Sequence, residues 1–434
     1  MLAILRRFTR PTLAATAATL LFAASSASFA QEIPAPNYDE AKVPRFELPD
    51  PLVAADGTKI ETADDWRNKR RPELLDLFAR EMFGKRPVVA PEKIAFEELT
   101  SAPNALGGKA TRKEIRIYFD ATNKTPKADL LIYIPNERKA PAPVFLMPNF
   151  EGNWATTDDP GVRAFEIAGH YWNAGKTPEE TRGAVKGRWS FDRIVSRGYA
   201  VATLCYEEVD ADFDDGFKNG VHPLFGDRSD AGDETASIAA WAWALSRALD
   251  CLETLPEIDA TKAIVAGHSR LGKTALWAGA QDERFAAVIS NNSGCGGAAL
   301  SRREFGETVA KINKSFPHWF CGNFKKYGAD VNALPFDQHE LIALIAPRPV
   351  YVASATQDTW ADPKGEFLSA LNADPVYRLL GTDGFGGVAE QPGPNVSVGA
   401  TIRYHLRTGK HDVTDFDWIQ YLDFADETVL KIKR

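Results

Sequence analysis

Apolar residues recur along the chain in two spacings, one typical of helices and one typical of buried strands. Residues 66–83 have helical spacing, with Leu74 and Phe78 on the apolar stripe. Residues 113–119 and 128–134 alternate or run apolar, as β-strands do. Residues 31–60, rich in Pro, Asp and Ala, fit neither spacing and predict an irregular arm.

The rest of the chain alternates short apolar runs with longer helical stretches. We expect strands at 144–147, 199–204, 263–266, 286–290 and 349–353, and helices at 189–196, 234–255, 271–279 and 413–430. Strands that alternate with helices form a parallel sheet that is covered on both faces. The pattern therefore predicts an α/β fold, a three-layer sandwich around a mostly parallel sheet.

Three stretches between these elements are too long to be simple connections, namely 150–188, 206–232 and 296–340. Long loops in compact domains are usually functional. In an open α/β sheet, sites form at the carboxyl edge of the strands. We expect these three insertions to surround the active site there.

The first 30 residues differ from everything that follows. Three basic residues, Arg6, Arg7 and Arg10, precede an apolar run that ends in small residues before Gln31. This is the pattern of a secretory signal peptide. A membrane anchor is the alternative, but the run is short for a span of about 20 residues. We expect a secreted or periplasmic protein.

The chain then divides into a signal peptide (1–30), an N-terminal arm and helix that pack on the core (31–110), and a catalytic domain (111–434). Loss of the three signal-peptide arginines lowers the net charge from −8 to −11. This charge argues against nucleic acid and anionic membranes as partners.

Four cysteines fall in the mature chain. In an oxidising compartment they can pair in three ways. Proximity in the sequence favours Cys205–Cys251 and Cys295–Cys321. No pair has the CxxC spacing of a zinc site, so we expect no bound zinc.

A serine between two glycines links the strand at 263–266 to the helix at 271–279. Residues 267–272 read Gly-His-Ser-Arg-Leu-Gly. A strand, a sharp turn around a serine and a helix form a nucleophile elbow, which projects the hydroxyl beside helix N-terminal N–H groups that can receive an oxyanion. Leu271 departs from the G-x-S-x-G pattern, and a helix-capping serine is the alternative. We predict that Ser269 is a nucleophile.

A serine needs a base to remove its proton, and in this fold the chain order is serine, acid, histidine. Three histidines follow at or after position 339. His411 lies in a loop just before the last helix, which is where the base belongs. His339 reads as a structural helix residue and His405 as a strand residue. We predict that His411 is the base.

The acid is expected just after the strand at 349–353. Asp358 stands nearest to the end of that strand, and Asp362 is the alternative. A carboxylate there would hold the imidazole tautomer and stabilise the imidazolium. We predict Asp358 as the acid, against the reading of a solvated turn carboxylate.

Residues 207–215 form an acidic segment after the strand at 199–204. Its acids are Glu207, Glu208, Asp210, Asp212, Asp214 and Asp215. Alternating aspartates can bind calcium, but the glycine and glutamate spacing of an EF-hand is absent. We expect a solvated loop and no metal site.

Taken together, these motifs resemble the glucuronoyl esterases, carbohydrate esterase family 15. Residues 267–273 match the family signature G-x-S-R-x-G-K, and Ser269 and His411 match its nucleophile and base. The likeness also includes 291–297, 316–319, 346–349, 357–360 and 409–411. It spans most of residues 140–415. The resemblance implies an α/β-hydrolase fold, of bacterial type, that cleaves esters between glucuronic acid on xylan and lignin alcohols.

The resemblance also implies three sugar-binding residues. Lys273 matches a lysine that binds sugar hydroxyls, Glu307 a glutamate that meets the 2-hydroxyl, and Trp360 a tryptophan that lines the sugar pocket. Each has a structural alternative. Lys273 reads as a solvated helix residue, Glu307 as a surface carboxylate and Trp360 as core.

Around the nucleophile the resemblance implies one shared feature and two departures. Arg270 matches an arginine that helps to stabilise the oxyanion. Many members carry a glutamate at the position of Asn292, so the acid must be the later Asp358. Fungal members carry a cysteine in place of His268, so a disulfide beside the active site is lost.

We therefore predict a secreted serine esterase that hydrolyses esters of (4-O-methyl-)glucuronic acid through an acyl-enzyme. Its substrates would be glucuronoxylan or lignin–carbohydrate esters. We expect a monomer with no metal, no cofactor, no nucleic acid and, after signal cleavage, no membrane as a partner. One alternative is an acetyl xylan esterase or another carbohydrate esterase on the same fold. Another is a non-catalytic glycan-binding protein, against which the intact Ser269, Asp358 and His411 argue.

Overall fold

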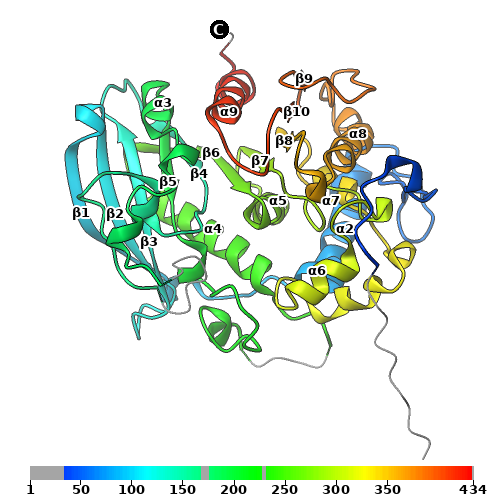
Figure 1. The fold of residues 1–434 in the computed structure, drawn as a ribbon, viewed down its shortest axis with the longest axis horizontal. Coiled ribbons are helices and arrows are strands. Elements are labelled where there is room, and N and C mark those ends of the chain that lie inside the picture. The colour runs from blue at the N-terminus through cyan, green and yellow to red at the C-terminus, as the bar shows by residue number, and fades with distance from the viewer. Residues whose placement is uncertain (1–33, 168–174, 227–230, 433–434) are drawn as a thin grey trace, which may run out of the picture. The chain divides into compact units, whose positions relative to one another are not determined.

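One sheet of ten strands organises the computed structural model, which describes residues 34–167, 175–226 and 231–432 (Figure 1). The strand order is β1-β2-β3-β5-β4-β6-β7-β8-β10-β9. The strands are β1 Ala95–Ala105, β2 Ala110–Tyr118, β3 Lys127–Pro135, β4 Ala142–Leu146, β5 Ala200–Thr203, β6 Ile258–His268, β7 Ala287–Asn291, β8 Val350–Ala355, β9 Ser397–Gly399 and β10 Ile402–Arg407. The middle of the sheet, from β5 to β10 in that order, is parallel. The strands at its two ends pair antiparallel.

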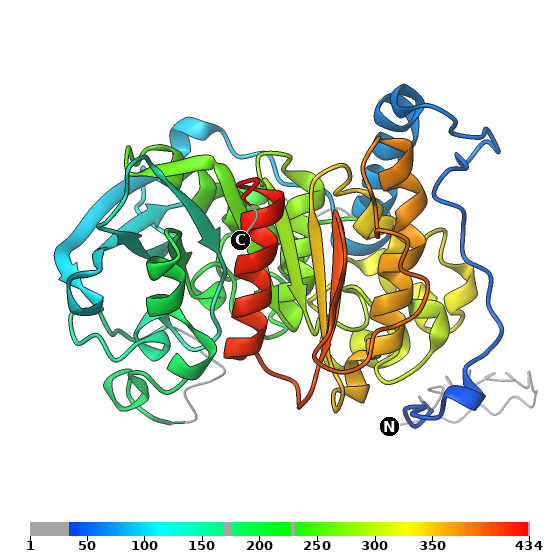
Figure 2. The same ribbon diagram turned by 90° about the horizontal axis from the view of Figure 1, so that it is seen from above.

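Helices cover both faces of this sheet. They are α1 Ala63–Asp65, α2 Arg71–Phe78, α3 Phe191–Ser196, α4 Ser237–Glu253, α5 Arg270–Gln281, α6 Val309–Ser315, α7 Gln338–Ala343, α8 Pro363–Leu379 and α9 Asp415–Thr428. Figure 1 shows α3 and α9 on one face and α4 and α5 on the other. Figure 2 shows α9 lying over the middle of the sheet. The predicted three-layer sandwich around a mostly parallel sheet is confirmed.

The central strands explain why the apolar runs in the sequence are continuous. Every residue of β4, β7 and β8 is buried, because helices close both sides of the sheet. The Ala- and Trp-rich helix α4 buries Trp241, which packs on Tyr206, and Trp243, which packs on Phe119. A strand with two buried faces has no position for a solvated side chain, so the polar residues gather where strands end.

Four neighbouring strands, β6, β7, β8 and β10, end side by side at one edge. Ser269 follows β6, Asn292 follows β7, Asp358 lies just after β8, and His411 lies just after β10. The carboxyl edge of a parallel sheet is where sites form in α/β folds. The topology alone therefore brings these side chains together.

The disulfide pairing expected from the sequence is wrong. Cys205, Cys251, Cys295 and Cys321 are all free and buried. The Sγ atom of Cys205 contacts the carbonyl oxygen of Phe150, while that of Cys321 contacts the carbonyl oxygen of Arg80. Proximity along the chain did not bring the thiols together in space.

Residues Ala35–Arg434 form one compact unit. Strand β1 lies within the predicted N-terminal part (31–110) and pairs with β2, so it belongs to the same sheet as the other strands. No helix in the described ranges is long and apolar enough to cross a membrane. The predicted signal peptide, residues 1–30, lies outside the described residues.

Candidate active site

Ser269 occupies the turn between β6 and α5 in a strained backbone conformation, with φ 57° and ψ −128°. A residue other than glycine costs about 1–3 kcal/mol in this region and persists only where its surroundings hold it. Here the Ser269 N–H donates to the carbonyl oxygen of Asn291 on the neighbouring strand at 2.9 Å. The carbonyl oxygen of Ser269 accepts from the N–H of Gly272 at 2.9 Å, which starts the helix. The predicted strand, sharp turn and helix are therefore present.

The unusual glycine spacing of this turn follows from its packing. A Cβ atom on Gly267 would lie 1.9 Å from the carbonyl oxygen of Leu271, inside van der Waals contact. A Cβ atom on Gly272 would lie 3.0 Å from the Cβ of Ser293, on the segment after β7. The side chain of Leu271 points into the core and is fully buried. Close approach thus falls on positions 267 and 272, so the elbow needs no glycine at position 271.

His411 and Asp358 form a close pair at the carboxyl edge. The Nδ1 atom of His411 lies 2.6 Å from the Oδ2 atom of Asp358. The Asp358 side chain is buried, whereas 41% of the His411 side chain is exposed. The His411 ring packs on the ring of His268, the residue before Ser269, with 4.5 Å between ring centroids. The histidine is therefore tied to a buried carboxylate and lies beside the elbow.

The alternative acid and bases have other partners. Asp362 pairs with Arg303, with 2.8 Å between its Oδ2 and the arginine Nε. The buried His339 contacts the carbonyl oxygen of Pro49 at 2.9 Å. The Nε2 atom of His405 lies 2.9 Å from the Oδ1 of Asp417, which belongs to α9. Neither histidine pairs with Asp358.

Asn292 stands next to the acid and supplies a donor to it. Its Nδ2 atom donates to the Oδ2 of Asp358 at 2.7 Å. Its Oδ1 atom is buried without a hydrogen-bond partner among the described residues. A carboxamide carries no charge, so it cannot act as the acid itself. It instead gives the Asp358 carboxylate a second hydrogen bond beside that of His411.

Arg270, the first residue of α5, is fixed over an aromatic surface. Its guanidinium lies 4.5 Å from the ring centroid of Trp319 and 5.3 Å from that of Phe316. It also forms an ion pair with Asp212. Cation–π contacts and an ion pair together restrict a long side chain to one orientation. Arg270 therefore presents a fixed positive charge beside Ser269.

The solvated loop expected at 207–215 is wrong in its central part, because Glu207, Asp210 and Asp212 are buried. Asp212 accepts hydrogen bonds from the Trp319 Nε1 at 2.7 Å and the Tyr206 hydroxyl at 2.6 Å. Burial raises the pKa of Asp212, but these bonds, the His318 contact and Arg270 outweigh it and lower the pKa to about 2. The segment is a structural support for Arg270.

Lys273, in the first turn of α5, and Glu307 are both buried. The Nζ atom of Lys273 donates to the carbonyl oxygen of Ser293. Burial lowers the pKa of Lys273, and the Glu307 carboxylate opposes that shift. Burial raises the pKa of Glu307, opposed by Lys273 and Arg270. The two side chains thus stabilise each other's charge, and neither is the solvated surface residue of the alternative reading.

Trp360 lies next to Glu307 and remains partly open to solvent. The backbone N–H of Glu307 donates to the carbonyl oxygen of Trp360 at 3.0 Å. A Cβ atom on Gly306 would lie 2.4 Å from that same oxygen, so the two segments touch. The Trp360 side chain is 37% exposed, which excludes a core role. A partly exposed indole therefore lies beside a buried carboxylate.

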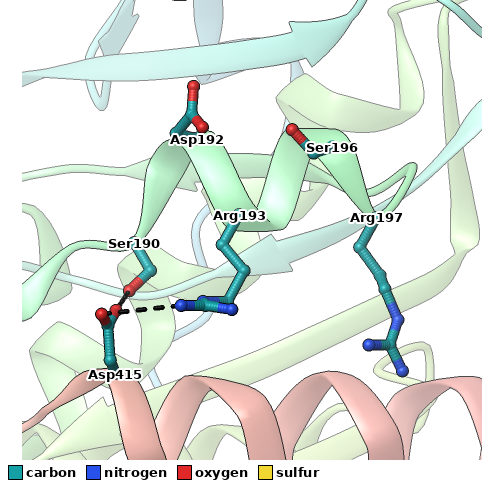
Figure 3. Close-up of a pocket in the computed structure, with 6 residues that line it drawn as sticks. All are labelled: Ser190, Asp192, Arg193, Ser196, Arg197 and Asp415. Carbon is teal, nitrogen blue, oxygen red and sulfur yellow. Dashed lines mark hydrogen bonds and ion pairs between the residues drawn. The ribbon is translucent and has the colours of Figure 1, made fainter.

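A hollow with a volume of about 540 Å³ lies between α3 and α9 (Figure 3). Its lining includes Ser190, Arg193, Arg197 and Asp415. Arg193 points toward Asp415 across the hollow, at 3.6 Å. None of the predicted site residues lines it. Within the described ranges, no group of three or more His, Cys, Asp or Glu side chains could hold a metal ion.

Comparison with known proteins places the chain in a family. A protein named Carbohydrate esterase MZ0003, from an unknown prokaryotic organism, is 50% identical over 402 residues, which cover 90% of this chain and 91% of that protein. The chain belongs to carbohydrate esterase family 15. It is thus a carboxylic ester hydrolase. The family model described as "Glucuronyl esterase, fungi" matches residues 179–381 of this family member.

Two solved structures extend the likeness across the fold. The glucuronoyl esterase from Solibacter usitatus is 46% identical, with a TM-score of 0.85, over 89% of this chain and 99% of that one. An esterase of the same family from a marine bacterial metagenome, described as promiscuous, is 49% identical, with a TM-score of 0.84, over 91% and 100%. A 4-O-methyl-glucuronoyl methylesterase of Phanerochaete chrysosporium is 34% identical over 202 residues, 44% of this chain and 43% of that protein. The α/β-hydrolase fold and the bacterial likeness are confirmed.

The structure of this esterase adds residues that the sequence left without a role. Asp212 was hidden by the other acids of its loop, and nothing in the pattern marks it as buried. His318, whose Nε2 lies 2.8 Å from the Oδ1 of Asp212, stands in a segment that matches the family but suggests no chemistry. Asp212 pairs with Arg270, and His318 contacts Asp212. A polar residue inside an aromatic cluster is visible only once the loops are folded.

Proposed function

We propose that this family member is a glucuronoyl esterase that uses Ser269, His411 and Asp358 in an acyl-enzyme mechanism. The observation that carries the proposal is the contact between His411 and Asp358 beside the elbow, at 2.6 Å from Nδ1 to Oδ2. A carboxylate at Nδ1 leaves the proton on that nitrogen and directs the lone pair of Nε2 toward the nucleophile. Asn292 supports the acid that this chain uses in place of the glutamate of other members.

The reaction begins when His411 takes the proton of the Ser269 hydroxyl. The serine oxygen attacks the carbonyl carbon of the uronate ester, and the carbonyl oxygen becomes an oxyanion. The N–H groups at the start of α5 and the guanidinium of Arg270 face that charge. The buried, ionised Asp212 keeps the guanidinium in place throughout.

The tetrahedral intermediate then collapses. The alcohol leaves with the proton that His411 held, and the glucuronoyl group stays on Ser269. Water attacks this ester while His411 takes its proton, the second tetrahedral intermediate collapses, and His411 gives that proton to the Ser269 oxygen as glucuronic acid is released. In each half of the cycle one proton passes through the imidazole, which Asp358 keeps oriented.

Sugar recognition is assigned to the buried pair and the exposed indole. Lys273 and Glu307 offer a donor and an acceptor to the ring hydroxyls, and Trp360 offers an apolar face. Relatives named 4-O-methyl-glucuronoyl methylesterases support glucuronate as the acyl part. We extend this to esters of glucuronoxylan with lignin alcohols as the substrate class, and we keep the monomer, the 31–110 and 111–434 division and the 1–30 signal peptide as proposals.

The test is hydrolysis of benzyl glucuronate by the purified chain, with acetylated xylan as the parallel substrate. The expected result is turnover of the glucuronate ester with a kcat/KM well above that for acetate release. Turnover of acetylated xylan alone would replace the proposal with an acetyl xylan esterase. Hydrolysis of neither substrate would contradict catalysis and favour a glycan-binding protein.

A further inference from the structure

The loop that carries His411 closes around the guanidinium of Arg407. The Nη2 atom of Arg407 donates to the carbonyl oxygens of Lys410 and Asp412, both at 2.9 Å. These two carbonyls flank His411 in the chain. The Arg407 side chain is buried, at the end of β10. One arginine therefore fixes the backbone on both sides of the histidine.

Gly409 packs closely against the guanidinium of Arg407. Its φ is 128°, in the region that favours glycine. A Cβ atom there would lie 2.8 Å from the Nη1 of Arg407. The carbonyl oxygen of Gly409 also accepts from the N–H of Gln357 at 2.8 Å, next to Asp358. The loop is thus shaped around Arg407 and fastened to the segment that carries the acid.

Asp417, in the first turn of α9, holds Arg407 in turn. Its Oδ2 lies 2.9 Å from the arginine Nε. Its Oδ1 lies 2.9 Å from the Nε2 of His405, and its Oδ2 accepts from the N–H of Thr414 at 2.7 Å. Asp417 is fully buried. A buried carboxylate with this many partners has a single orientation, so Arg407 is anchored to the body of α9.

Asn291 connects this anchor to the elbow. Its Nδ2 donates to the Tyr421 hydroxyl at 2.7 Å and to the Oδ1 of Asp417 at 3.4 Å. The amide nitrogen is thereby identified as the donor, which leaves Oδ1 to accept from the Nδ1 of His268 at 2.7 Å. His268 directly precedes Ser269 and packs on His411. These contacts therefore connect His268, the residue before the nucleophile, both to Asp417 and to the ring of the base, His411.

We propose that Arg407 is a positioning residue for the base, and that His268, Asn291, Asp417 and Arg407 form a clamp that fixes His411 relative to Ser269. We name these four residues the base clamp. The contacts between these four buried residues close into a circuit through the loop and the ring of His411. The inference rests on the proposed role of His411 as base.

The test compares three variants of the full chain. Arg407→Met removes the donors to the loop and keeps the length of the side chain. Arg407→Lys keeps the charge beside Asp417 but cannot donate to two carbonyls in one plane. Arg348→Met is the matched control, because Arg348 also donates to three backbone carbonyls, those of Gly279, Asp282 and Phe285, before β8 and away from the carboxyl edge.

Two readouts are needed, and one is independent of activity. The first is kcat and KM for benzyl glucuronate. The second is the downfield proton resonance of the His411 Nδ1–H bonded to Asp358, assigned by its loss in His411→Gln. We expect Arg407→Met to lower kcat about 10–100-fold with little change in KM, since a shift of about 1 Å in a catalytic group costs that much. We expect the resonance to broaden or vanish, and Arg407→Lys to lie in between.

Arg348→Met should lose a similar amount of thermal stability while it keeps both kcat and the resonance. If Arg407→Met, or Arg407→Lys where the methionine variant does not fold, keeps the wild-type resonance and kcat, the clamp is contradicted. A wild-type activity that survives His411→Gln would contradict the proposed function instead. In that case the resonance alone still decides whether Arg407 positions His411.

Discussion

The Asp358 carboxylate is shared by two neighbours, since its Oδ2 lies 2.6 Å from the Nδ1 of His411 and 2.7 Å from the Nδ2 of Asn292. The same oxygen thus orients the base and is itself held by an amide from the adjacent strand. Among the described residues, Asp358 is thus the acid in contact with His411, just after β8.

Asp358→Asn should lower kcat by about 10³–10⁴-fold, because an amide can stabilise the wrong imidazole tautomer and cannot stabilise the imidazolium. KM for benzyl glucuronate should change little. The matched control is Asp362→Asn, which breaks the pair with Arg303 and should reduce stability more than kcat. Steady-state kinetics on both variants decide the point. A larger kcat loss at position 362 would move the acid there.

Asp212→Asn should lower kcat for glucuronate esters about 10–100-fold, because Arg270 loses the charge that aims it at the oxyanion. The exposed Asp214 of the same loop supplies the control variant Asp214→Asn. Steady-state kinetics on Asp212→Asn and Asp214→Asn test whether the buried acid acts through Arg270. Equal activities of the two variants would remove that role.

Glu307→Gln should raise KM for benzyl glucuronate about 10-fold, since a hydrogen bond between a charged group and a sugar hydroxyl is worth about 1.5–3 kcal/mol. Hydrolysis of an acetate ester without a sugar should be unchanged. Glu304→Gln, at an exposed position in the same segment, is the control. A parallel loss on both esters would instead assign Glu307 to the chemistry or the fold.

Glu366, buried behind the acid, should make stability fall as pH rises. Burial raises the pKa of Glu366 to about 8, against hydrogen bonds from Ser354 and the Gly294 N–H. Its pKa in the folded protein exceeds the ordinary value of 4.5. Its contribution is therefore complete below that value and is lost as the pH rises through about 8, with a slope of about 1.4 kcal/mol per pH unit.

The measurement is urea unfolding of the wild type and Glu366→Gln at several pH values between those limits. Relative to the wild type, the variant should gain stability as the pH rises, because glutamine stays neutral. Glu283→Gln, whose side chain is 65% exposed, should run parallel to the wild type. A constant difference between the wild type and Glu366→Gln would show that Glu366 does not titrate in this range.

The sequence predicted the elements whose pattern is local. The helix over 66–83, the buried central strands and the Ala-rich α4 all appear close to the expected bounds. Helix α8 was not predicted, because Pro375 lies inside it and its apolar residues follow no clear stripe. Its start depends on Asp362, whose side chain caps the N–H of Gly365. Such a cap is visible only in three dimensions.

The residues of the candidate site also differ in whether a local sequence pattern reveals them. The positions of Ser269, Asp358 and His411 at the carboxyl edge were predictable because each follows a strand of the parallel sheet. Asp212 and Arg407 were not, because their roles come from partners more than 50 residues away or from backbone carbonyls that no pattern reveals. The cysteine pairing failed for a related reason, since distance along the chain says little about buried thiols.

The central claim is that Ser269 carries the glucuronoyl group during turnover. Its most direct test is peptide mass spectrometry of the enzyme quenched during benzyl glucuronate hydrolysis, beside Ser269→Ala treated identically. We expect a glucuronoyl adduct on the peptide that contains Ser269, none in the variant, and a fall of several orders of magnitude in the variant's turnover. An adduct on another residue, or a Ser269→Ala variant that hydrolyses the ester at the wild-type rate, would contradict this claim.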